Sequence, residues 1–335
     1  MAPVPETFET VSLPEPLRLS SGARLERATL AWAGWGERRP EAAVILLHGL
    51  SRSQRAFAPG SVPGRSADGW ANPLFSPGQP LDPARHWIVC PNLLGSPFGS
   101  TSPASPEWSG RPFPELSILD MADAVHGFMR ALGIGKARAI GFSLGGMVAL
   151  ALAARHPGAV RVAATLGGPA ILPAGSRRRL GLVATMLLAD PEYRADGQGE
   201  GALRALKRAR VAMLRDLYPH DFALRGGAFE AERALEAEAD LFARSFDGRC
   251  YLALCRAMSS ADLTGALPAI KARFLVAASS SDPLATPGSM QDTYHQLTAA
   301  GVRTRYFEVG GENGHHAFYR ETDDLAFALR DVVSG

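Results

Sequence analysis

The chain has 335 residues, of which 46% are hydrophobic and 20% are charged, and its formal net charge at pH 7 is +2. This length can bury a large core, either as one big domain or as a core domain with an insertion. The nearly balanced charge gives no basis for nucleic-acid binding. The three cysteines are too few for a disulfide framework, and their spacing matches no zinc site. We therefore expect a globular protein with no metal and no bound cofactor.

The sequence shows neither of two segments that direct a protein to a membrane: a secretion signal and a membrane-spanning stretch. Residues 1–6 have neither a basic start nor an apolar run, so no secretion signal is visible. No apolar stretch approaches the length of a membrane span. These features predict a cytoplasmic protein that does not interact with membranes.

Short apolar runs alternate with helical patterns along most of the chain, which predicts an α/β protein with a mostly parallel sheet covered on both faces. Residues 17–35 are expected to form antiparallel edge strands, and residues 51–80 a long loop rich in Gly, Pro and Ser. Loops of that length near a site are usually functional or mobile. Further strands are expected at 43–47, 87–90, 137–140, 162–166, 274–278 and 305–309, and helices at 118–132, 145–156, 287–300 and 323–333.

The segment 172–266 differs from the rest because it contains no strand-like run and is rich in Arg, Ala, Leu and Glu. It falls between the expected strands 162–166 and 274–278. This position predicts a helical lid inserted over one edge of the sheet. Residues 1–171 and 267–335 then form the core domain.

The run Gly141-Phe142-Ser143-Leu144-Gly145 has the pattern Gly-x-Ser-x-Gly and stands between an expected strand and an expected helix. A serine on such a sharp turn has its hydroxyl exposed to a substrate carbonyl, and the flanking glycines allow the strained backbone. A Gly/Ser-rich turn without chemistry is the alternative. The strand before it and the helix after it favour a nucleophile at Ser143.

A serine nucleophile needs a base, and the base needs an acid that orients it. Asp282 follows the strand-like run 272–278, and His315 follows the run 304–309. The chain order Ser143, Asp282, His315 is the order of an α/β-hydrolase triad. Two alternatives stay open: Asp282 precedes a proline and can be only a turn former, and His316 is the neighbouring candidate for the base.

The oxyanion hole is expected from two backbone N–H groups, those of Leu50 and Leu144. Leu50 belongs to the run His48-Gly49-Leu50, which follows the expected strand 43–47. His48 is expected to shape this turn rather than to act as the base.

In the expected lid, residues 202–218 have a helical pattern whose inward face includes an arginine. The face consists of Leu203, Leu206, Arg210, Met213 and Leu217. Arg210 can extend to the edge of the helix or pair with a core carboxylate. Alternatively, it can point into the cavity and bind a substrate carboxylate or a phosphate of a carrier.

Seven segments carry a resemblance to a known family: 92–101, 110–114, 143–147, 242–247, 251–258, 280–284 and 314–318. They resemble the homoserine O-acetyltransferases, which have the α/β-hydrolase fold and move an acetyl group from acetyl-CoA to an amino-acid hydroxyl through an acyl-serine. The resemblance implies acetyl-CoA as a co-substrate and a homodimer formed through the lid. It also implies that Arg210 and Tyr218 bind the carboxylate end of the acceptor.

Three positions depart from the family pattern. The family usually has Gly-Gly-Ser-Met-Gly-Gly at the nucleophile, whereas this chain has Phe142 before the serine and Leu144 after it. The family's aspartate after the catalytic histidine, which helps to hold the acceptor, is His316 here. An imidazole cannot replace a carboxylate that faces an ammonium group. We therefore expect His316 and Phe142 at the substrate site, and packing is the alternative role for Phe142.

Two functions follow from these patterns, and both use a small-molecule acyl donor. The first is a Ser-His-Asp O-acyltransferase whose acceptor is an amino-acid hydroxyl. The second is a carboxylesterase on the same scaffold, in which water is the acceptor.

Overall fold

The structure is a computed structural model that describes residues 6–60, 67–196, 199–217 and 228–334. Tyr218, expected at the substrate site, lies outside the described residues.

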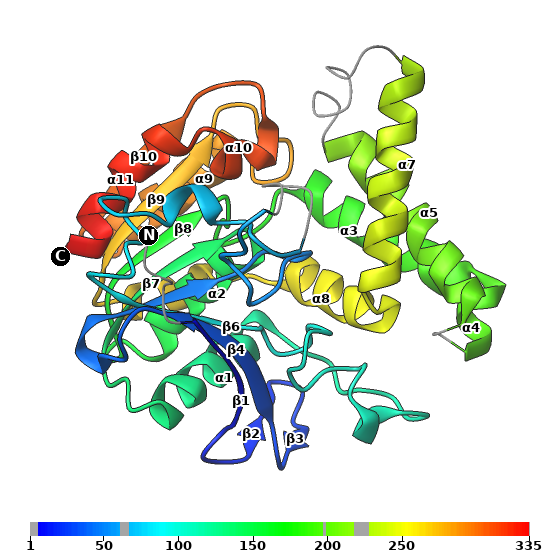
Figure 1. The fold of residues 1–335 in the computed structure, drawn as a ribbon, viewed down its shortest axis with the longest axis horizontal. Helices are drawn as coiled ribbons and strands as arrows, with labels where there is room; N and C mark the ends of the chain where they lie inside the picture. The colour runs from blue at the N-terminus through cyan, green and yellow to red at the C-terminus, as the bar shows by residue number, and fades with distance from the viewer. Residues whose placement is uncertain (1–5, 61–66, 197–198, 218–227, 335) are drawn as a thin grey trace.

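A central sheet of eight strands runs through the structure (Figure 1). Its strands are β1 (Glu6–Ser12), β4 (Thr29–Trp35), β5 (Ala43–Leu47), β6 (Trp87–Pro91), β7 (Ala137–Phe142), β8 (Val160–Leu166), β9 (Arg273–Ser279) and β10 (Thr304–Val309). The order is β1-β4-β6-β5-β7-β8-β9-β10. The pairs β1–β4 and β4–β6 are antiparallel and all other pairs are parallel, so the expected α/β class with a mostly parallel sheet is confirmed.

One edge of the sheet differs from the expectation for residues 17–35. Only β4 joins the main sheet from that range, while β2 (Leu17–Arg18) and β3 (Arg24–Leu25) form a separate two-stranded sheet. The edge strand β1 was not predicted. It lacks an apolar run because it lies at an edge, where its partner is β4 alone and Phe8 is 45% exposed.

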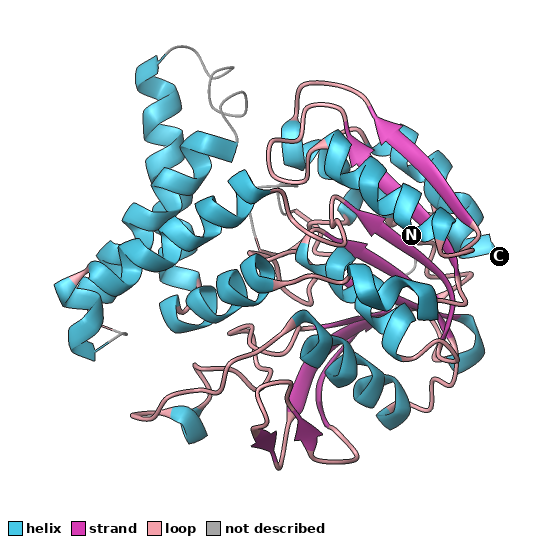
Figure 2. Ribbon diagram, turned by 180° about the vertical axis from the view of Figure 1, so that it is seen from behind, coloured by secondary structure: helices cyan, strands magenta, loops and turns pink. Residues whose placement is uncertain are grey.

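Helices cover both faces of the sheet, as Figures 1 and 2 show. Outside the segment between β8 and β9, the α-helices are α1 (Ile118–Ala131), α2 (Leu144–Arg155), α9 (Pro287–Ala299), α10 (Ala317–Arg320) and α11 (Thr322–Ser334). Short 3₁₀ helices are η1 (Pro40–Ala42), η2 (Asn72–Leu74), η3 (Pro106–Trp108), η4 (Thr264–Ala269) and η5 (Gly314–His316). None of the described helices is long and apolar enough to cross a lipid bilayer.

The segment between β8 and β9 contains a group of helices that lies beside the sheet in both views (Figures 1 and 2). They are α3 (Ala174–Ala189), α4 (Pro191–Asp196), α5 (Glu200–Leu217), α7 (Ala228–Ser245) and α8 (Gly248–Ser260). α3 packs against α8 and α5, and α5 packs on α7. α3, α5, α7 and α8 thus form one packed group of helices.

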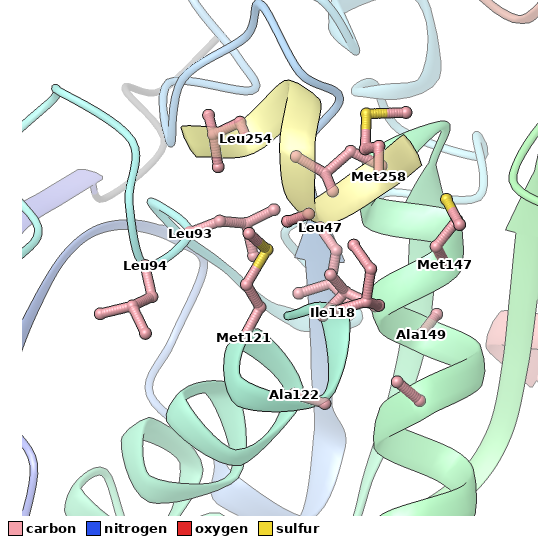
Figure 3. Close-up of a cluster of buried hydrophobic side chains, with 14 of the residues drawn as sticks. Leu47, Leu93, Leu94, Ile118, Met121, Ala122, Met147, Ala149, Leu254 and Met258 are labelled. Carbon is pink, nitrogen blue, oxygen red and sulfur yellow. The ribbon is translucent and has the colours of Figure 1, made fainter. Parts of the chain in front are cut away.

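The central strands are buried on both faces, which explains why they read as continuous apolar runs. Along β5, Ile45 and Leu47 belong to a core cluster shared with α1 and α2, while Val44 and Leu46 belong to a second cluster shared with α11. This alternation follows the two-residue period of a strand. Figure 3 shows part of the first cluster, in which side chains of α1, α2 and α8 gather around Leu47. The insertion is thus packed directly onto the core.

Candidate active site

Ser143 is the residue between β7 and α2, and its backbone is strained. Its φ is 53° and its ψ is −116°, and it is the one non-glycine residue with positive φ among those that the structure describes. Its N–H donates to the carbonyl of Leu166 at 2.8 Å, which ties the turn to β8. A strained backbone conformation of this kind persists only where neighbouring contacts stabilise it. In this conformation the serine hydroxyl points away from the sheet.

The glycines around Ser143 are required by close backbone contacts. A Cβ atom on Gly141 would lie 2.0 Å from the carbonyl oxygen of Gly145, and one on Gly145 would lie 2.0 Å from that of Leu47. A Cβ atom on Gly168 would lie 2.4 Å from the carbonyl oxygen of Ser143. The Gly-x-Ser-x-Gly pattern is therefore explained by packing of the turn against β5 and the loop after β8.

Asp282 and His315 form a buried pair at the ends of β9 and β10. Oδ2 of Asp282 lies 2.6 Å from Nδ1 of His315. The other oxygen, Oδ1, accepts hydrogen bonds from the backbone N–H groups of Leu284 at 2.8 Å and Ala285 at 3.0 Å. Asp282 is 2% exposed and His315 is 6% exposed. The backbone N–H groups hold the carboxylate, and the carboxylate holds the Nδ1 edge of the imidazole, so the two residues have the geometry of an acid–base pair.

Two further hydrogen bonds fix the loop that carries His315. Oγ of Ser279 donates to the carbonyl of Gly314 at 2.8 Å, and the N–H of Gly314 donates to Oγ of Ser281 at 3.0 Å. Because Ser279 ends β9 and Ser281 lies in the turn after it, the loops that carry Asp282 and His315 are joined to each other.

A small cavity of about 40 Å³, called here the inner cavity, brings the candidate residues together. Ser143 and His315 both line it, with Asp282 behind the histidine. Its other lining residues come from the loop after β5, from the helical insertion and from the C-terminal part: Gly49, Leu50, Ser51, Arg52, Leu180, Arg210, Met213, Tyr251, Met258, Leu284, His316 and Tyr319. The geometry can therefore perform nucleophilic attack by serine on a small acyl group.

Of the two residues expected to donate to the oxyanion, Leu144 directly follows Ser143 in the chain and Leu50 lines the inner cavity. Leu144 is the first residue of α2, and the first N–H groups of a helix have no partner within the helix. The partial positive charge of the helix N-terminus adds to this donor. Leu50 lines the inner cavity beside Ser143. Both N–H groups therefore belong to backbone that borders the serine.

His48 shapes the turn before Leu50. Its Nδ1 lies 2.9 Å from the carbonyl oxygen of Gly49, and its Nε2 lies 2.9 Å from the backbone nitrogen of Leu93. The N–H of Leu93 donates to Nε2, so Nδ1 carries the proton and donates to Gly49. Burial lowers the pKa of His48 from 6.5 to about 4. Both ring nitrogens are thus occupied and the ring is neutral, in agreement with a turn-shaping role.

Arg210 of α5 combines features of both roles that the sequence left open. Its side chain is buried, its Nη2 lies 3.8 Å from Oε1 of Glu238, and its guanidinium carbon lies 4.5 Å from the ring centre of Phe242. It also lines the inner cavity with Ser143. Glu238 of α7 therefore pairs with a cation that lines the same cavity as Ser143.

The chain's relatives were identified by sequence. A model of the alpha/beta hydrolase fold family matches residues 42–322. Serine O-succinyltransferase of Litchfieldella anticariensis is 33% identical, and the alignment covers 99% of each chain. Homoserine O-acetyltransferase of Caulobacter vibrioides is 30% identical, over 96% of this chain and 92% of that enzyme.

The chain belongs to the homoserine O-acetyltransferase-like family of the α/β-hydrolase fold. This membership confirms the resemblance found in the sequence. The crystal structure of esterase E22 superimposes with a TM-score of 0.85 at 20% identity, covering 98% of this chain and all of that one, and it shows the same fold. The relatives named as transferases use two different acyl groups, acetyl and succinyl.

Two of the residues that depart from the family pattern, His316 and Phe142, occupy different places. His316 is buried and lines the inner cavity, with its ring centre 5.9 Å from that of Tyr319. Phe142 is 1% exposed and packs against Trp70 and Tyr319, with ring centres 4.7 Å and 5.7 Å away. The ring of Phe142 belongs to the core cluster of α11 and does not line the inner cavity, so its contact with the site runs through Tyr319.

Sequence reasoning did not single out Arg52 and Tyr319, which line the inner cavity. Arg52 lies two positions after Leu50, in the long loop that begins at residue 51, and Tyr319 directly follows the segment 314–318. Their positions next to Leu50 and to the segment 314–318 were the sequence features that could have identified them as site residues. A charged residue in a polar loop carries no periodic pattern, so its burial could not be read from the sequence.

No group of three His, Cys, Asp or Glu side chains in the described residues could hold a metal ion. The three cysteines are buried and unpaired with one another, and burial raises the pKa values of Cys250 and Cys255 to about 12. Thiols with such pKa values are unreactive near neutral pH. Ser143 is therefore the best candidate nucleophile that borders the inner cavity.

Proposed function

We propose that this protein transfers an acyl group from a coenzyme A thioester to the hydroxyl of an amino acid, through an acyl group on Ser143. The observation that carries the proposal is one cavity lined by the strained Ser143, by His315 paired with Asp282, and by the cation Arg210. Relatives at 30–33% identity over nearly the whole chain are named as serine O-succinyltransferase and homoserine O-acetyltransferase.

In the first step, Nε2 of His315 takes the proton of the Ser143 hydroxyl as its oxygen attacks the thioester carbonyl. Asp282 holds the Nδ1–H and stabilises the imidazolium. The N–H groups of Leu50 and Leu144 stabilise the oxyanion, and the loss of one such donor typically costs about 2.7–4 kcal/mol. The C–S bond then breaks, and the coenzyme A thiol leaves with the proton from His315.

In the second step, the hydroxyl of the acceptor loses its proton to His315 and attacks the acyl-serine. The new ester leaves, and Ser143 regains a proton from His315. Arg210 is proposed to bind the acceptor carboxylate, because a guanidinium binds a carboxylate through two hydrogen bonds. The family resemblance assigns the same task to Tyr218. An acceptor held in this way competes with water because it is already positioned.

We further propose that residues 172–266 act as a lid over residues 1–171 and 267–335. Leu180 of α3, Arg210 and Met213 of α5, and Tyr251 and Met258 of α8 all line the inner cavity. The insertion thus supplies one wall of the site and can restrict the entry of water.

Ester hydrolysis is the second candidate function, and His316 is the observation that favours it. His316 lines the cavity at the position where the family has an aspartate, so the ammonium group of an amino acid lacks that partner. If the acceptor binds weakly, water attacks the acyl-serine instead. Acetyl-CoA is the donor that the family resemblance implies for the transferase.

The experiment that separates the two functions measures coenzyme A release by the purified protein with acetyl-CoA or succinyl-CoA, with and without L-serine or L-homoserine. Hydrolysis of p-nitrophenyl acetate is measured in parallel. Release that depends on the amino acid, together with an O-acylated product found by mass spectrometry, establishes the transferase. Rapid ester hydrolysis with both thioesters untouched establishes the hydrolase.

A further inference from the structure

Arg210 of α5 and Glu238 of α7 form an ion pair that is largely buried but not in hydrogen-bond contact. Their side chains are 6% and 18% exposed, and Nη2 of Arg210 lies 3.8 Å from Oε1 of Glu238, which is too long for a hydrogen bond. Nε of Arg210 has no hydrogen-bond partner among the described residues. Burying a cation is costly unless hydrogen bonds satisfy it. The pair therefore leaves room for a ligand that completes it.

Arg210 stands between two adjoining cavities. It lines the inner cavity with Ser143, and it also lines a larger cavity of about 340 Å³, called here the outer cavity. Two residues of the loop after β5 line both cavities as well, so the two cavities share a border. Glu238 lines the outer cavity beside Phe242. A molecule bound by both Arg210 and Glu238 therefore has its charged part in the outer cavity, next to the cavity of the serine.

Other ion pairs between α5 and α7 have neither property. Nζ of Lys207 lies 2.8 Å from Oε2 of Glu236, and Arg215 pairs with Glu232. The side chains of these pairs are more exposed, and none of the four residues lines the inner or the outer cavity. The two helices are thus joined by closer pairs nearer the surface. Joining the helices does not by itself explain an open pair at a cavity.

The sizes of the cavities indicate how an amino acid would lie. The inner cavity has about 40 Å³, and one water molecule needs roughly 10–15 Å³, so this cavity holds only a few atoms. The hydroxyl end of the amino acid belongs there, and its charged head group belongs in the outer cavity. An α-amino acid carries a carboxylate and an ammonium group on the same carbon atom. These opposite charges match a guanidinium and a carboxylate that lie side by side.

We propose that Glu238 binds the ammonium group of the amino-acid acceptor while Arg210 binds its carboxylate. The inference rests on the proposed acyl transfer to an amino acid, and it names the residue that selects an amino acid over a hydroxy acid. The ammonium group then lies in the outer cavity, whereas His316 lines the inner cavity. Glu238 thus supplies the carboxylate that the family has at the position of His316. It touches the acceptor and takes no part in proton transfer.

Asp68 is the other carboxylate among the described residues that line the outer cavity, so it is a rival for the ammonium group. It accepts a hydrogen bond from Oγ of Ser53 at 2.5 Å. The carboxylate within ion-pair distance of Arg210 is that of Glu238. An amino acid whose carboxylate is bound by Arg210 therefore has its ammonium group nearer to Glu238, and Asp68→Asn tests the rival.

The test compares each amino acid with the hydroxy acid that lacks only its amino group: L-serine with β-hydroxypropionate, and L-homoserine with γ-hydroxybutyrate. Acyl transfer from acetyl-CoA or succinyl-CoA is measured at a fixed thioester concentration. We expect the wild type to prefer the amino acid in kcat/KM by at least about tenfold. Glu238→Gln should lower kcat/KM for the amino acid by about 10- to 100-fold, mainly through KM, and for the hydroxy acid by less than about threefold, because a charge-assisted hydrogen bond is lost.

Glu236→Gln is the matched control, because Glu236 belongs to the same helix and lines neither cavity. Four results would overturn the inference: a wild type that uses the hydroxy acid as well as the amino acid, equal loss for both acceptors in Glu238→Gln, the same change of preference in Glu236→Gln, or that change in Asp68→Asn instead. If Glu238→Gln does not fold, Glu238→Asp keeps the charge and withdraws it by one methylene. Its preference should fall several-fold, and an unchanged preference would overturn the role of Glu238.

Failure of the proposed transfer gives a different result. If no acceptor is acylated, the transfer fails, and the same acceptors are tested as inhibitors of p-nitrophenyl acetate hydrolysis. The amino acid should inhibit the wild type at a concentration at least about tenfold lower than the hydroxy acid does, and it should lose this advantage in Glu238→Gln. No inhibition by the amino acid, or equal inhibition by both compounds, would remove Glu238 from the binding site.

Discussion

The Nδ1 atom of His315 lies 2.6 Å from Oδ2 of Asp282, although the two residues are 33 positions apart in the chain. They meet because β9 and β10 are parallel neighbours whose C-terminal ends lie at the same edge of the sheet. The second oxygen of Asp282 is held by two backbone N–H groups, so the carboxylate has one orientation. This orientation determines which ring nitrogen of His315 faces the cavity.

Replacing Asp282 by Asn should lower kcat by about 10⁴-fold, because the amide stabilises the wrong tautomer of His315. Ester hydrolysis by the purified variant measures this. Asp262→Asn is the control, since Asp262 is exposed and accepts hydrogen bonds from the N–H and the hydroxyl of Thr264. Retention of more than a tenth of the activity in Asp282→Asn would remove Asp282 from the proposed triad.

The variants His315→Ala and His316→Ala distinguish the roles of two neighbouring buried histidines. The structure pairs His315 with Asp282, so His315→Ala should lower kcat by at least about 10⁴-fold. His316→Ala should change kcat by less than about tenfold and act mainly on the KM of the acceptor. Steady-state kinetics of both variants checks this, and the reverse order of effects would assign the base to His316.

Arg210→Leu should raise the KM of the amino-acid acceptor by about 10- to 100-fold, since the loss of a charge-assisted hydrogen bond costs about 1.5–3 kcal/mol. Hydrolysis of p-nitrophenyl acetate, which has no carboxylate, should change much less. Lys207→Met on the same helix is the control, because Lys207 pairs with Glu236 and does not line the inner cavity. Equal effects on both reactions would indicate that Arg210 supports the fold of the insertion.

Gly145→Ala should destabilise the protein by at least about 3 kcal/mol or prevent folding, because the new Cβ would lie 2.0 Å from the carbonyl oxygen of Leu47. Gly181→Ala in α3 is the matched control: its Cβ would meet nothing within 4 Å, and it should gain about 0.5–1 kcal/mol from helix propensity. Urea unfolding of the two variants measures both values. A stable Gly145→Ala variant would contradict the close packing of the turn.

His48 should make the folded state sensitive to acid. Its pKa is about 4 in the folded protein and 6.5 ordinarily, so the unfolded chain binds a proton more readily between these two pH values. The stability linked to a neutral His48 is therefore present above pH 6.5 and is lost as the pH falls towards 4, by about 3 kcal/mol.

The measurement is the free energy of unfolding at pH 7.0, 5.5 and 4.5 for the wild type and His48→Gln. Glutamine can donate to Gly49 and accept from Leu93 but does not titrate, so the variant should lose less stability on acidification. Identical pH dependence in the two proteins would assign the acid sensitivity to other groups.

The sequence by itself determined the fold class and the position of the nucleophile turn. Apolar runs of strand length alternate with helical patterns because the parallel strands are buried on both faces, and this pattern is local. The turn at Ser143 is equally local, since its glycines are required by a backbone geometry that spans a few residues. The order of Ser143, Asp282 and His315 along the chain then followed from the fold.

The tertiary structure alone decided which side chains surround the inner cavity. Arg52 follows Leu50 in a polar loop and looks like a surface residue, yet contacts from segments distant in sequence, such as Tyr319, bury it. Phe142 stands next to the serine in sequence but points to the opposite side, because successive residues at a strand end face different ways. Burial of a charge and the direction of a side chain depend on long-range packing, which no local pattern records.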